Sequence, residues 1–275
     1  MLRDMTRAAP TRANVTVRDV RGVDELHACQ ELQRKAWGIT EDGYVVPVAT
    51  MAAVQRVGGL ILGAFDADAR LVGFAFAFLG KLNDQLILWS QLTGVHPAQQ
   101  STGVGRMLKL EQRRRAREMG LDTIAWAFDP LQASNAAFNL GVLGATSRIY
   151  EQDMYGSRTD ALNVGMATDR LVAEWSTHGE PGGRTAPWPD ATELIEVHGH
   201  EVRDVRAIRG DADHLHIEIP PNLSRVKASG RPSAARDWQS AVRQAFQAAF
   251  ASGYVAVGFT RQDPSHPKYV LERRP

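Results

Sequence analysis

Two closely spaced glycines after a predicted strand are the residues of this chain best suited to binding an anion. The strand ends at Val95, Pro97 follows it, and Gly103 and Gly105 lead into a predicted helix. Glycine adopts backbone angles denied to other residues and lets a ligand lie against the main chain. The unpaired N–H groups and the dipole of a first helical turn favour negative charge. The loop is therefore predicted to bind a pyrophosphate.

The loop lacks residues that define two other phosphate-binding motifs. A P-loop carries a Lys-Ser/Thr pair directly after its last glycine, whereas Arg106 follows Gly105 here. A dinucleotide fingerprint carries a third glycine, which this segment does not have. Two interpretations are left: a pyrophosphate cradle of another class, or an ordinary Gly-rich turn between a strand and a helix.

The segment Gln100-Ser-Thr-Gly103-Val-Gly105 resembles the Gln/Arg-x-x-Gly-x-Gly/Ala signature of the GNAT superfamily of acetyltransferases. Val95-His-Pro97 stands where that family has a Val-x-Pro lead-in, and the order of predicted elements from about Val15 to Trp175 resembles the GNAT fold. Further segments resemble a poorly characterised bacterial clade of predicted acetyltransferases: Trp126-Ala-Phe-Asp-Pro-Leu131, Asn135, Gly144-Ala145, Tyr155-Gly156 and Asp169-Arg-Leu171.

The resemblance implies that acetyl-CoA is the acyl donor and that backbone amides from Gln100 to Arg106 hold its pyrophosphate. The exposed edge of Leu92–Val95 would pair with the pantetheine amides, and a splay between this strand and Thr123–Phe128 would admit the thioester. Asn135 would contact the pantetheine arm, with Phe138 beside it. The implied cofactor-binding residues are Leu92, Thr93, Gly94, Val95, Gln100, Ser101, Thr102, Gly103, Val104, Gly105, Arg106, Asn135 and Phe138.

Acetyl transfer to an amine needs a base, stabilisation of the oxyanion, and an acid for the departing thiolate. The backbone N–H near Thr93 or Gly94 would serve the oxyanion. Many GNAT relatives carry a Glu on the signature strand, but Trp89–Thr93 offers no carboxylate here. Asp129, at the end of the neighbouring predicted strand, is therefore the candidate catalytic base. The alternative for Asp129 is a structural Asp-Pro turn.

The catalytic acid is not assigned by the resemblance. The family places a Tyr four residues before the Gly that ends the last helix, and counting back from Gly144 gives Leu140. Tyr150 and Tyr155 are predicted on the following strand, where core or strand packing explains them better than catalysis. Release of the thiolate directly to solvent is the other interpretation.

Residues near the first two predicted helices occupy the region where the GNAT fold receives its acceptor. Trp37, Tyr44 and Val46 suit an apolar or aromatic acceptor, although core packing explains Trp37 equally well. Glu41 and Asp42 in the same region are weaker candidates for the base.

A basic run follows the glycine loop on the same predicted helix. It offers a cation to the 3′-phosphate of CoA, although a solvated face with cations near the helix C-terminus explains most of it better. A nucleic-acid-associated role is a third interpretation, based on Arg113–Arg117 alone. The run comprises Lys109, Arg113, Arg114, Arg115 and Arg117.

Two histidine pairs have the spacing of residues on one face of a strand. His198-Gly-His200 and His214-Leu-His216 would form a metal site together with Glu218 or Asp213. The closer ligand spacing of known zinc motifs is absent from the sequence, so histidines at the surface of edge strands are the favoured interpretation. No metal is expected.

Hydrophobic periodicity predicts the elements that position these residues. One helix is expected around Leu26 and Cys29 and ends at Gly38, and a second begins at Pro47. Further helices are predicted at Val104–Met119, Ser134–Leu143 and Trp238–Phe250. The predicted strands are Val15–Val20, Leu60–Phe65, Leu71–Leu79, Leu86–Val95, Thr123–Phe128, Ile149–Tyr155, Arg170–Trp175, Glu193–Val197, His214–Ile219, Tyr254–Thr260 and Tyr269–Glu272.

The predicted fold class is α/β (α+β): a GNAT-type mixed sheet flanked by helices, followed by a smaller C-terminal α/β unit. We expect a disordered tail at 1–13, the GNAT domain at 14–176, a Gly- and Pro-rich linker at 177–190, and the C-terminal domain at 191–275. That last domain is interpreted as a degenerate second GNAT copy without a CoA loop, which covers the acceptor site or forms a homodimer contact.

The composition favours a cytoplasmic protein without a nucleic-acid or membrane partner. The 275 residues carry a formal net charge of +1, a single cysteine and no apolar run long enough to span a bilayer. The sequence therefore predicts an acetyl-CoA-dependent N-acetyltransferase that acts on a small-molecule acceptor, an amine being expected. The alternative is a non-catalytic acyl-CoA-binding or regulatory module.

Overall fold

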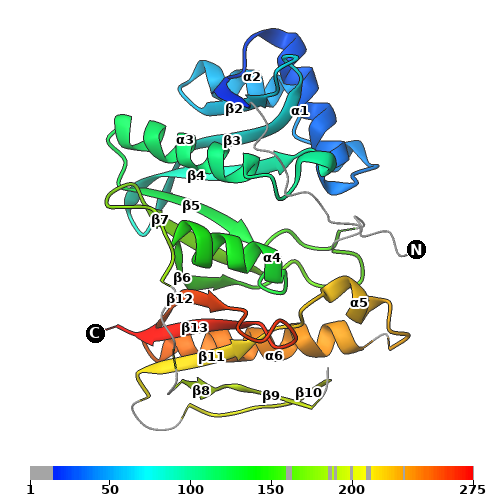
Figure 1. The fold of residues 1–275 in the computed structure, drawn as a ribbon, viewed down its shortest axis with the longest axis vertical. Helices are drawn as coiled ribbons and strands as arrows, with labels where there is room; N and C mark the ends of the chain where they lie inside the picture. The colour runs from blue at the N-terminus through cyan, green and yellow to red at the C-terminus, as the bar shows by residue number, and fades with distance from the viewer. Residues whose placement is uncertain are drawn as a thin grey trace, which may run out of the picture. The chain divides into compact units, whose positions relative to one another are not determined.

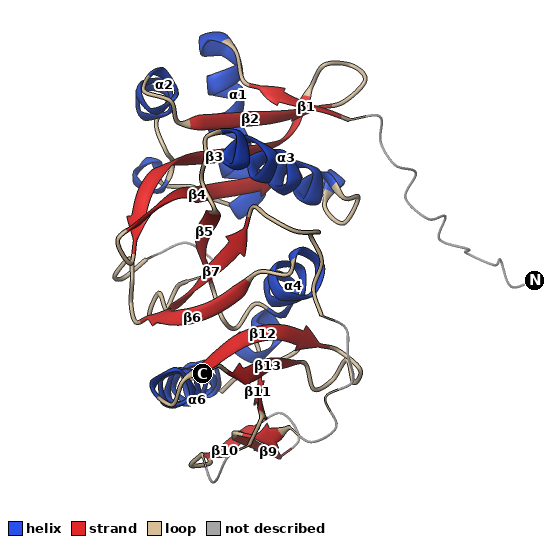
Figure 2. Ribbon diagram, turned by 90° about the vertical axis from the view of Figure 1, so that its left-hand side faces the viewer, coloured by secondary structure: helices blue, strands red, loops and turns tan. Residues whose placement is uncertain are grey.

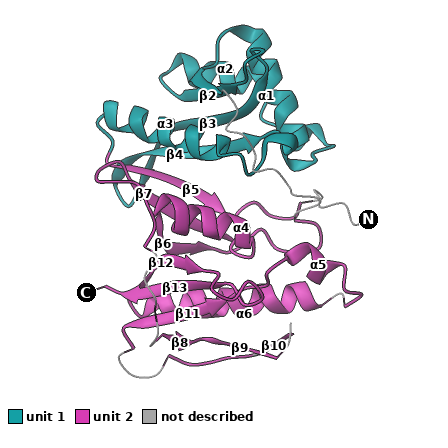
Figure 3. Cartoon of the chain, viewed as in Figure 1, with its two compact units in different colours: residues 1–121 teal, residues 122–275 magenta. Residues whose placement is uncertain are grey.

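The computed structural model describes residues 15–158, 163–184, 188, 191–198, 201–208, 212–231 and 233–274. The chain forms two compact units, residues 1–121 and 122–275 (Figure 3). The segment predicted as a linker at 177–190 belongs to the second unit, and the domain boundaries drawn from the sequence stay a prediction. The predicted tail at 1–13 lies outside the described residues. Within the described part of the chain, no helix has the length and apolar character needed to cross a bilayer.

The first unit contains an antiparallel sheet with the strand order β1-β2-β3-β4. Phe74 on β3 packs in a core cluster with Leu26, Cys29 and Met51 from the first two helices. Its neighbour Gly73 faces Val104 and Leu108 of α3. Successive strand residues point to opposite faces, so α1 and α2 cover one face and α3 the other (Figure 1). The elements are β1 Thr16–Asp19, α1 Gly22–Trp37, η1 Asp42–Tyr44, α2 Val48–Arg56, β2 Leu60–Phe65, β3 Leu71–Leu82, β4 Gln85–Val95, η2 Pro97–Gln99 and α3 Val104–Glu118.

A one-residue bulge interrupts the pairing of β4 with β3. Leu92 lies opposite Phe76 and Ser90 lies opposite Ala77, which leaves Gln91 as the extra residue of β4. A bulge of this kind bends the strand and changes the direction of nearby side chains. The segment predicted to lie beside the thioester is therefore irregular.

The second unit contains a longer sheet with the order β5-β7-β6-β12-β13-β11-β8, and β9 pairs with β10 separately (Figure 2). The β11–β8 pair is parallel and the other pairs are antiparallel, so the sheet is mixed. Its elements are β5 Thr123–Phe128, α4 Ala133–Ala136, the π-helical turn η3 Ala137–Leu143, β6 Thr146–Glu151, β7 Arg170–Ser176, β8 Thr192–Glu193, β9 Ile195–His198, β10 Glu201–Val205, β11 His214–Glu218, α5 Leu223–Lys227, α6 Ala234–Ala251, β12 Tyr254–Thr260 and β13 Lys268–Arg273.

A buried ion pair joins α6 to the β6–β7 hairpin within this unit. Arg243 donates two hydrogen bonds to Asp169, at 2.8 and 3.0 Å, and the Tyr150 hydroxyl donates to the same carboxylate at 2.6 Å. The Asp169 side chain has no exposed surface. A buried carboxylate is tolerated only when hydrogen bonds and an opposite charge compensate its desolvation, so Asp169 fixes α6 in place.

The predicted mixed α/β fold, a sheet flanked by helices, is confirmed. The strands Leu60–Phe65, Thr123–Phe128 and Tyr254–Thr260 have the predicted bounds. The strand predicted at Ile149–Tyr155 is wrong in part, because β6 ends at Glu151. The chain turns at Asp153, which has a φ of 49° and accepts hydrogen bonds from Thr168.

Candidate functional site

The glycine loop lies between β4 and α3 and turns the chain through two residues of positive φ. Ser101 has a φ of 64° and Gly103 a φ of 97°. The Thr102 hydroxyl donates to the Gln99 carbonyl at 2.7 Å and holds the turn. The Met107 amide donates to the Gly103 carbonyl at 3.0 Å. This is the first hydrogen bond of α3, so the amides of residues 104–106 have no carbonyl partner within the helix. Such amides are suited to binding an anion.

The two glycines of the loop serve different purposes. Gly103 needs its positive φ, and a methyl group there would meet no atom within 4 Å. Gly105 has an ordinary φ, and a methyl group there would lie 3.7 Å from Cγ2 of Val95, a normal contact. Gly103 is therefore required by the backbone, whereas at Gly105 the fold tolerates alanine and a ligand would set the limit.

The end of β4 and the loop are brought together within the first unit. Thr93 pairs with Ala75 and Gly94 with Phe74 on β3, and the Gln100 side chain donates to the Val95 carbonyl at 3.5 Å. Of the predicted cofactor-binding residues, those from Leu92 to Arg106 thus form one continuous segment that leads into α3, in which Gly94 and Val104 are buried.

A buried polar cluster beneath α3 is a feature that the sequence interpretation missed. The Lys109 ammonium donates to the Ser90 hydroxyl at 2.8 Å, and that hydroxyl bonds the Gln112 side-chain oxygen at 3.0 Å. Lys109 is 4% exposed, so the solvated face that the sequence favoured for most of the basic run does not apply to this residue. Burial lowers the pKa of Lys109 to about 7. The signal was present, because Gly105, Lys109 and Gln112 recur at the spacing of one helix face.

Two atoms of this region are buried without a hydrogen-bond partner among the described residues: the Thr93 hydroxyl and the Gln112 side-chain nitrogen. Gln112 has no exposed surface. Buried polar groups in proteins are nearly always bonded, and leaving one unbonded costs about 1–3 kcal/mol. Both atoms are therefore suited to a polar ligand.

The buried lysine has a consequence for stability against pH. The unfolded chain binds a proton at Lys109 below a pKa near 10.5, whereas the folded chain binds it only below about 7. Between these values the unfolded state binds more protons, so the free energy of unfolding rises with pH. We expect Lys109→Met to be more stable than wild type at pH 7, by on the order of a few kcal/mol, and to lose this rise. Urea denaturation from pH 6.5 to 10 measures both effects. An unchanged pH slope in Lys109→Met would contradict the prediction, and Lys81→Met, at an exposed site, is the control.

The candidate base Asp129 lies directly after β5 in the second unit. One carboxylate oxygen accepts the Leu131 amide at 2.8 Å, and the other accepts the Gln132 side chain at 3.4 Å. Burial raises the pKa of Asp129, while the Leu131 amide and Arg170 oppose that rise. The geometry is that of an Asp turn, yet an acid whose pKa is raised by burial is also a suitable proton acceptor.

Other site residues predicted from the sequence lie in the same unit. Asn135 is exposed on α4 and Phe138 is half-buried on η3. Leu140, at the position of the family's Tyr, has no exposed surface. Burial and the hydrogen bond to Asp169 raise the pKa of Tyr150, which fits a structural role.

The region predicted to receive the acceptor is only partly available. Trp37 packs edge-to-face on Phe74, with ring centroids 6.1 Å apart. Val46 exchanges hydrogen bonds with the buried Gln33. Asp42 forms an ion pair with Arg34 at 2.6 Å. Core packing thus accounts for Trp37 and ion pairing for Asp42.

Much of the basic run of α3 is paired within the first unit. Arg114 pairs with Glu111 and Glu118, and Arg115 pairs with Glu111 and Asp19. These arginines form a surface network on the helix, which fits the solvated interpretation of this part of the run.

The histidine pairs do not meet as a metal site within the described residues. His214 packs against the Trp188 ring, whereas His216 bonds Glu193 at 3.0 Å. Lys268 also bonds Glu193, at 2.7 Å. No group of three or more potential ligands is found in the described part of the chain. His200 lies outside that part.

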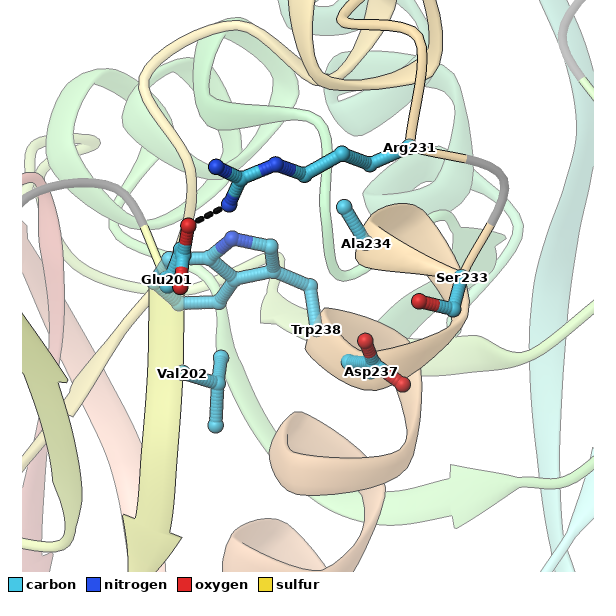
Figure 4. Close-up of a pocket in the computed structure, with 7 residues that line it drawn as sticks. All are labelled: Glu201, Val202, Arg231, Ser233, Ala234, Asp237 and Trp238. Atoms are coloured by element: carbon cyan, nitrogen blue, oxygen red, sulfur yellow. Dashed lines mark ion pairs between the residues drawn. The ribbon is translucent and has the colours of Figure 1, made fainter.

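A pocket of about 160 Å³ opens at the N-terminus of α6 in the second unit (Figure 4). An ion pair between Arg231 and Glu201 crosses it, and Trp238 forms its base. Its lining contains none of the catalytic or cofactor-binding residues predicted from the sequence. The lining residues are Glu201, Val202, Arg231, Ser233, Ala234, Asp237 and Trp238.

Comparison with known proteins returns similar solved structures. No family model and no curated protein matches the sequence. The chain is similar to the ribosomal-protein-S18-alanine N-acetyltransferase of Escherichia coli, with 16% identity, 63% of this chain and 99% of that one covered, and a TM-score of 0.47. YncA of Salmonella typhimurium, solved with its cofactor acetyl-CoA, is 19% identical, with 63% and 100% covered and a TM-score of 0.47. A Desulfovibrio desulfuricans protein assigned to the GNAT family is 14% identical, with 60% and 99% covered and a TM-score of 0.46.

Proposed function

We propose that this protein is an N-acyltransferase that moves an acetyl group from acetyl-CoA to a small-molecule acceptor, an amine. The observation that carries the proposal is the loop before α3, where the positive φ values of Ser101 and Gly103 lead into the first helical turn. Such a turn presents several N–H groups and the positive end of a helix dipole to one anion. The GNAT-like signature lies on this same loop.

The residues fit the cofactor that the resemblance implies. The amides of 100–106 would hold the pyrophosphate, and the strand segment Leu92–Val95 would bond the pantetheine amides. The buried, unbonded Thr93 hydroxyl lies in that segment and supports a polar ligand there. Asn135 and Phe138 complete the proposed contacts to the arm.

Acetyl-CoA supplies an activated thioester, and the protein's own groups supply the rest. We assign the oxyanion to the amides near Thr93 or Gly94 and the removal of the amine proton to Asp129. Transfer is direct, because Cys29 has no exposed surface and burial raises the pKa of its thiol to about 12. The thiolate is the nucleophilic form of cysteine, so a thiol that stays protonated does not take the acetyl group from the thioester.

The experiment is a thermal shift with CoA and acetyl-CoA, followed by a thiol-release screen across amines, amino acids and aromatic acceptors. A ligand that binds only the folded state raises the melting temperature, so a rise with either ligand and thiol release with at least one acceptor are expected. The absence of a shift would overturn the cofactor assignment. A shift without thiol release from any acceptor would favour the non-catalytic acyl-CoA-binding alternative, which the missing carboxylate of Trp89–Thr93 also favours.

A further inference from the structure

We infer that Lys109 is the general acid that protonates the sulfur of CoA as the thioester breaks. The inference rests on the proposed acyl transfer. It fills the role left open by Leu140, which stands where related proteins are expected to carry a Tyr.

The position of Lys109 along β4 supports this role. Its ammonium lies 2.8 Å from the Ser90 hydroxyl, and Ser90 precedes Val95 by five residues. Five residues of strand span about 16 Å, which is comparable to an extended pantetheine arm. An arm that starts at the glycine loop and follows β4 backwards therefore brings its sulfur to the level of Lys109.

The surroundings of Lys109 are polar in a way that a purely structural lysine does not need. Ser90 is 3% exposed, and the Gln112 side-chain nitrogen beside it is buried without a partner among the described residues. Burying an ammonium costs several kcal/mol unless it is compensated. A methionine would fill this position at lower cost, so the chain retains a group that can bind and release a proton.

The carboxylates near α3 within its own unit are each paired with a cation. The strands packed on α3 carry Arg18 and Asp19 on β1 and Lys81 on β3, whereas β2 and β4 contain only uncharged residues. Arg18 pairs with Glu25, Asp19 with Arg115, and Lys81 with Asp84. On α3 itself, Glu111 pairs with Arg114 and Arg115, and Glu118 with Arg114. Arg106 and Arg113, three residues before and four after Lys109, are cations like it. Burial, which lowers the pKa of Lys109 to about 7, therefore sets its titration.

The proton and electron balance of the step is complete. The amine nitrogen bonds the carbonyl carbon, and the tetrahedral intermediate collapses as the carbon–sulfur bond breaks and its electron pair goes to sulfur. The Lys109 ammonium then gives one proton to the thiolate, which leaves the free thiol of CoA and a neutral lysine. The proton removed from the amine by Asp129 is released to solvent, and Lys109 takes one from solvent before the next turnover.

The test uses the thiol of bound CoA and needs no acceptor. The ultraviolet absorbance of the thiolate is followed against pH for CoA bound to wild type and to Lys109→Met, with binding measured separately by calorimetry. Lys109 is charged only below a pKa of about 7, and in that range an ammonium within about 4–6 Å lowers the pKa of a thiol by about 1–3 units, so part of the thiolate of bound CoA forms already near pH 7. We expect wild type to show this shift relative to free CoA and Lys109→Met to lose it while still binding CoA. Lys81→Met, which removes an exposed lysine of the same unit, should behave as wild type.

The outcomes separate this inference from the proposed function. If wild type does not bind CoA, the cofactor assignment fails and the inference fails with it. If CoA binds but its thiol titrates as in free CoA, or if Lys109→Met keeps the shift, only the role of Lys109 is overturned. Lys109→Gln provides a second uncharged variant if Lys109→Met does not give a folded protein by circular dichroism, and the same criteria apply to it.

Discussion

Replacing Gly105 by valine is expected to abolish the rise in melting temperature that CoA gives to the wild-type protein. The branched side chain would project from the first turn of α3, where the amides of 104–106 are proposed to contact the pyrophosphate. A hydrogen bond to a charged group contributes about 1.5–3 kcal/mol. The loss of two such bonds therefore weakens binding by roughly a hundred-fold or more. Calorimetric titration with CoA measures the change directly.

Gly105→Ala is the matched control for this experiment. Its methyl group would make an ordinary contact with Val95, and alanine is the better helix former by about 1 kcal/mol. The resembled signature also accepts alanine at this position. We expect Gly105→Ala to keep the CoA response and Gly105→Val to lose it, although both fold. Normal binding by the valine variant would mean that the pyrophosphate does not lie on this turn.

Asp129→Asn is expected to lower turnover by roughly 10²–10⁴-fold while CoA affinity stays near that of wild type. Asparagine keeps the side-chain oxygen that accepts the Leu131 amide, so the turn after β5 is preserved. It has no carboxylate to accept a proton from the amine. Steady-state kinetics with an acceptor found by thiol release gives turnover, and calorimetry gives CoA affinity.

The control for Asp129→Asn lies at the other end of the same strand. Asp122 precedes β5 and bonds His178 at 2.7 Å on the surface, so Asp122→Asn should leave turnover unchanged. Full activity of Asp129→Asn together with a lower melting temperature would show that Asp129 only holds the turn. The base would then be sought at Glu41, Asp42 or a water held by Ser90 and Gln91.

Local patterns predicted most of the elements because each carried its own end signal. Gly38 follows α1 with a φ of 62°, and Gly144 follows η3 with a φ of 78°, as expected of glycines that end helices. The short helix α5 was not predicted. Its signal was Asn222, whose side chain accepts the Arg225 amide at 3.0 Å as a helix cap.

The buried part of the candidate site was harder to predict from the sequence, because burial depends on tertiary packing. Lys109 stands in a run of arginines, and the charge pattern favoured a solvated face for most of that run. Lys109 directly follows Leu108, which lies on the face of α3 that packs on the sheet. Lysines are usually exposed, so the residue type argued against burial at this position. The bulge at Gln91 could not be predicted either. No glycine marks it in the sequence, and it is defined only by the pairing of β4 with β3. The glycine loop before α3 could be predicted because glycine determines the backbone locally.

Strand β6 pairs with β7 on one side and with β12 on the other, and β12 is synthesised much later than β6. Ser147 of β6 pairs with Ala256 of β12, and 109 residues separate them (256 − 147). At roughly 5–20 residues per second the ribosome needs on the order of ten seconds to make that stretch. During this time the edge of β6 has N–H and C=O groups without their strand partner, which is a template for pairing with other chains. The nascent chain is therefore more prone than the finished protein to pair with other chains at this edge. It depends more on chaperones until β12 has been made.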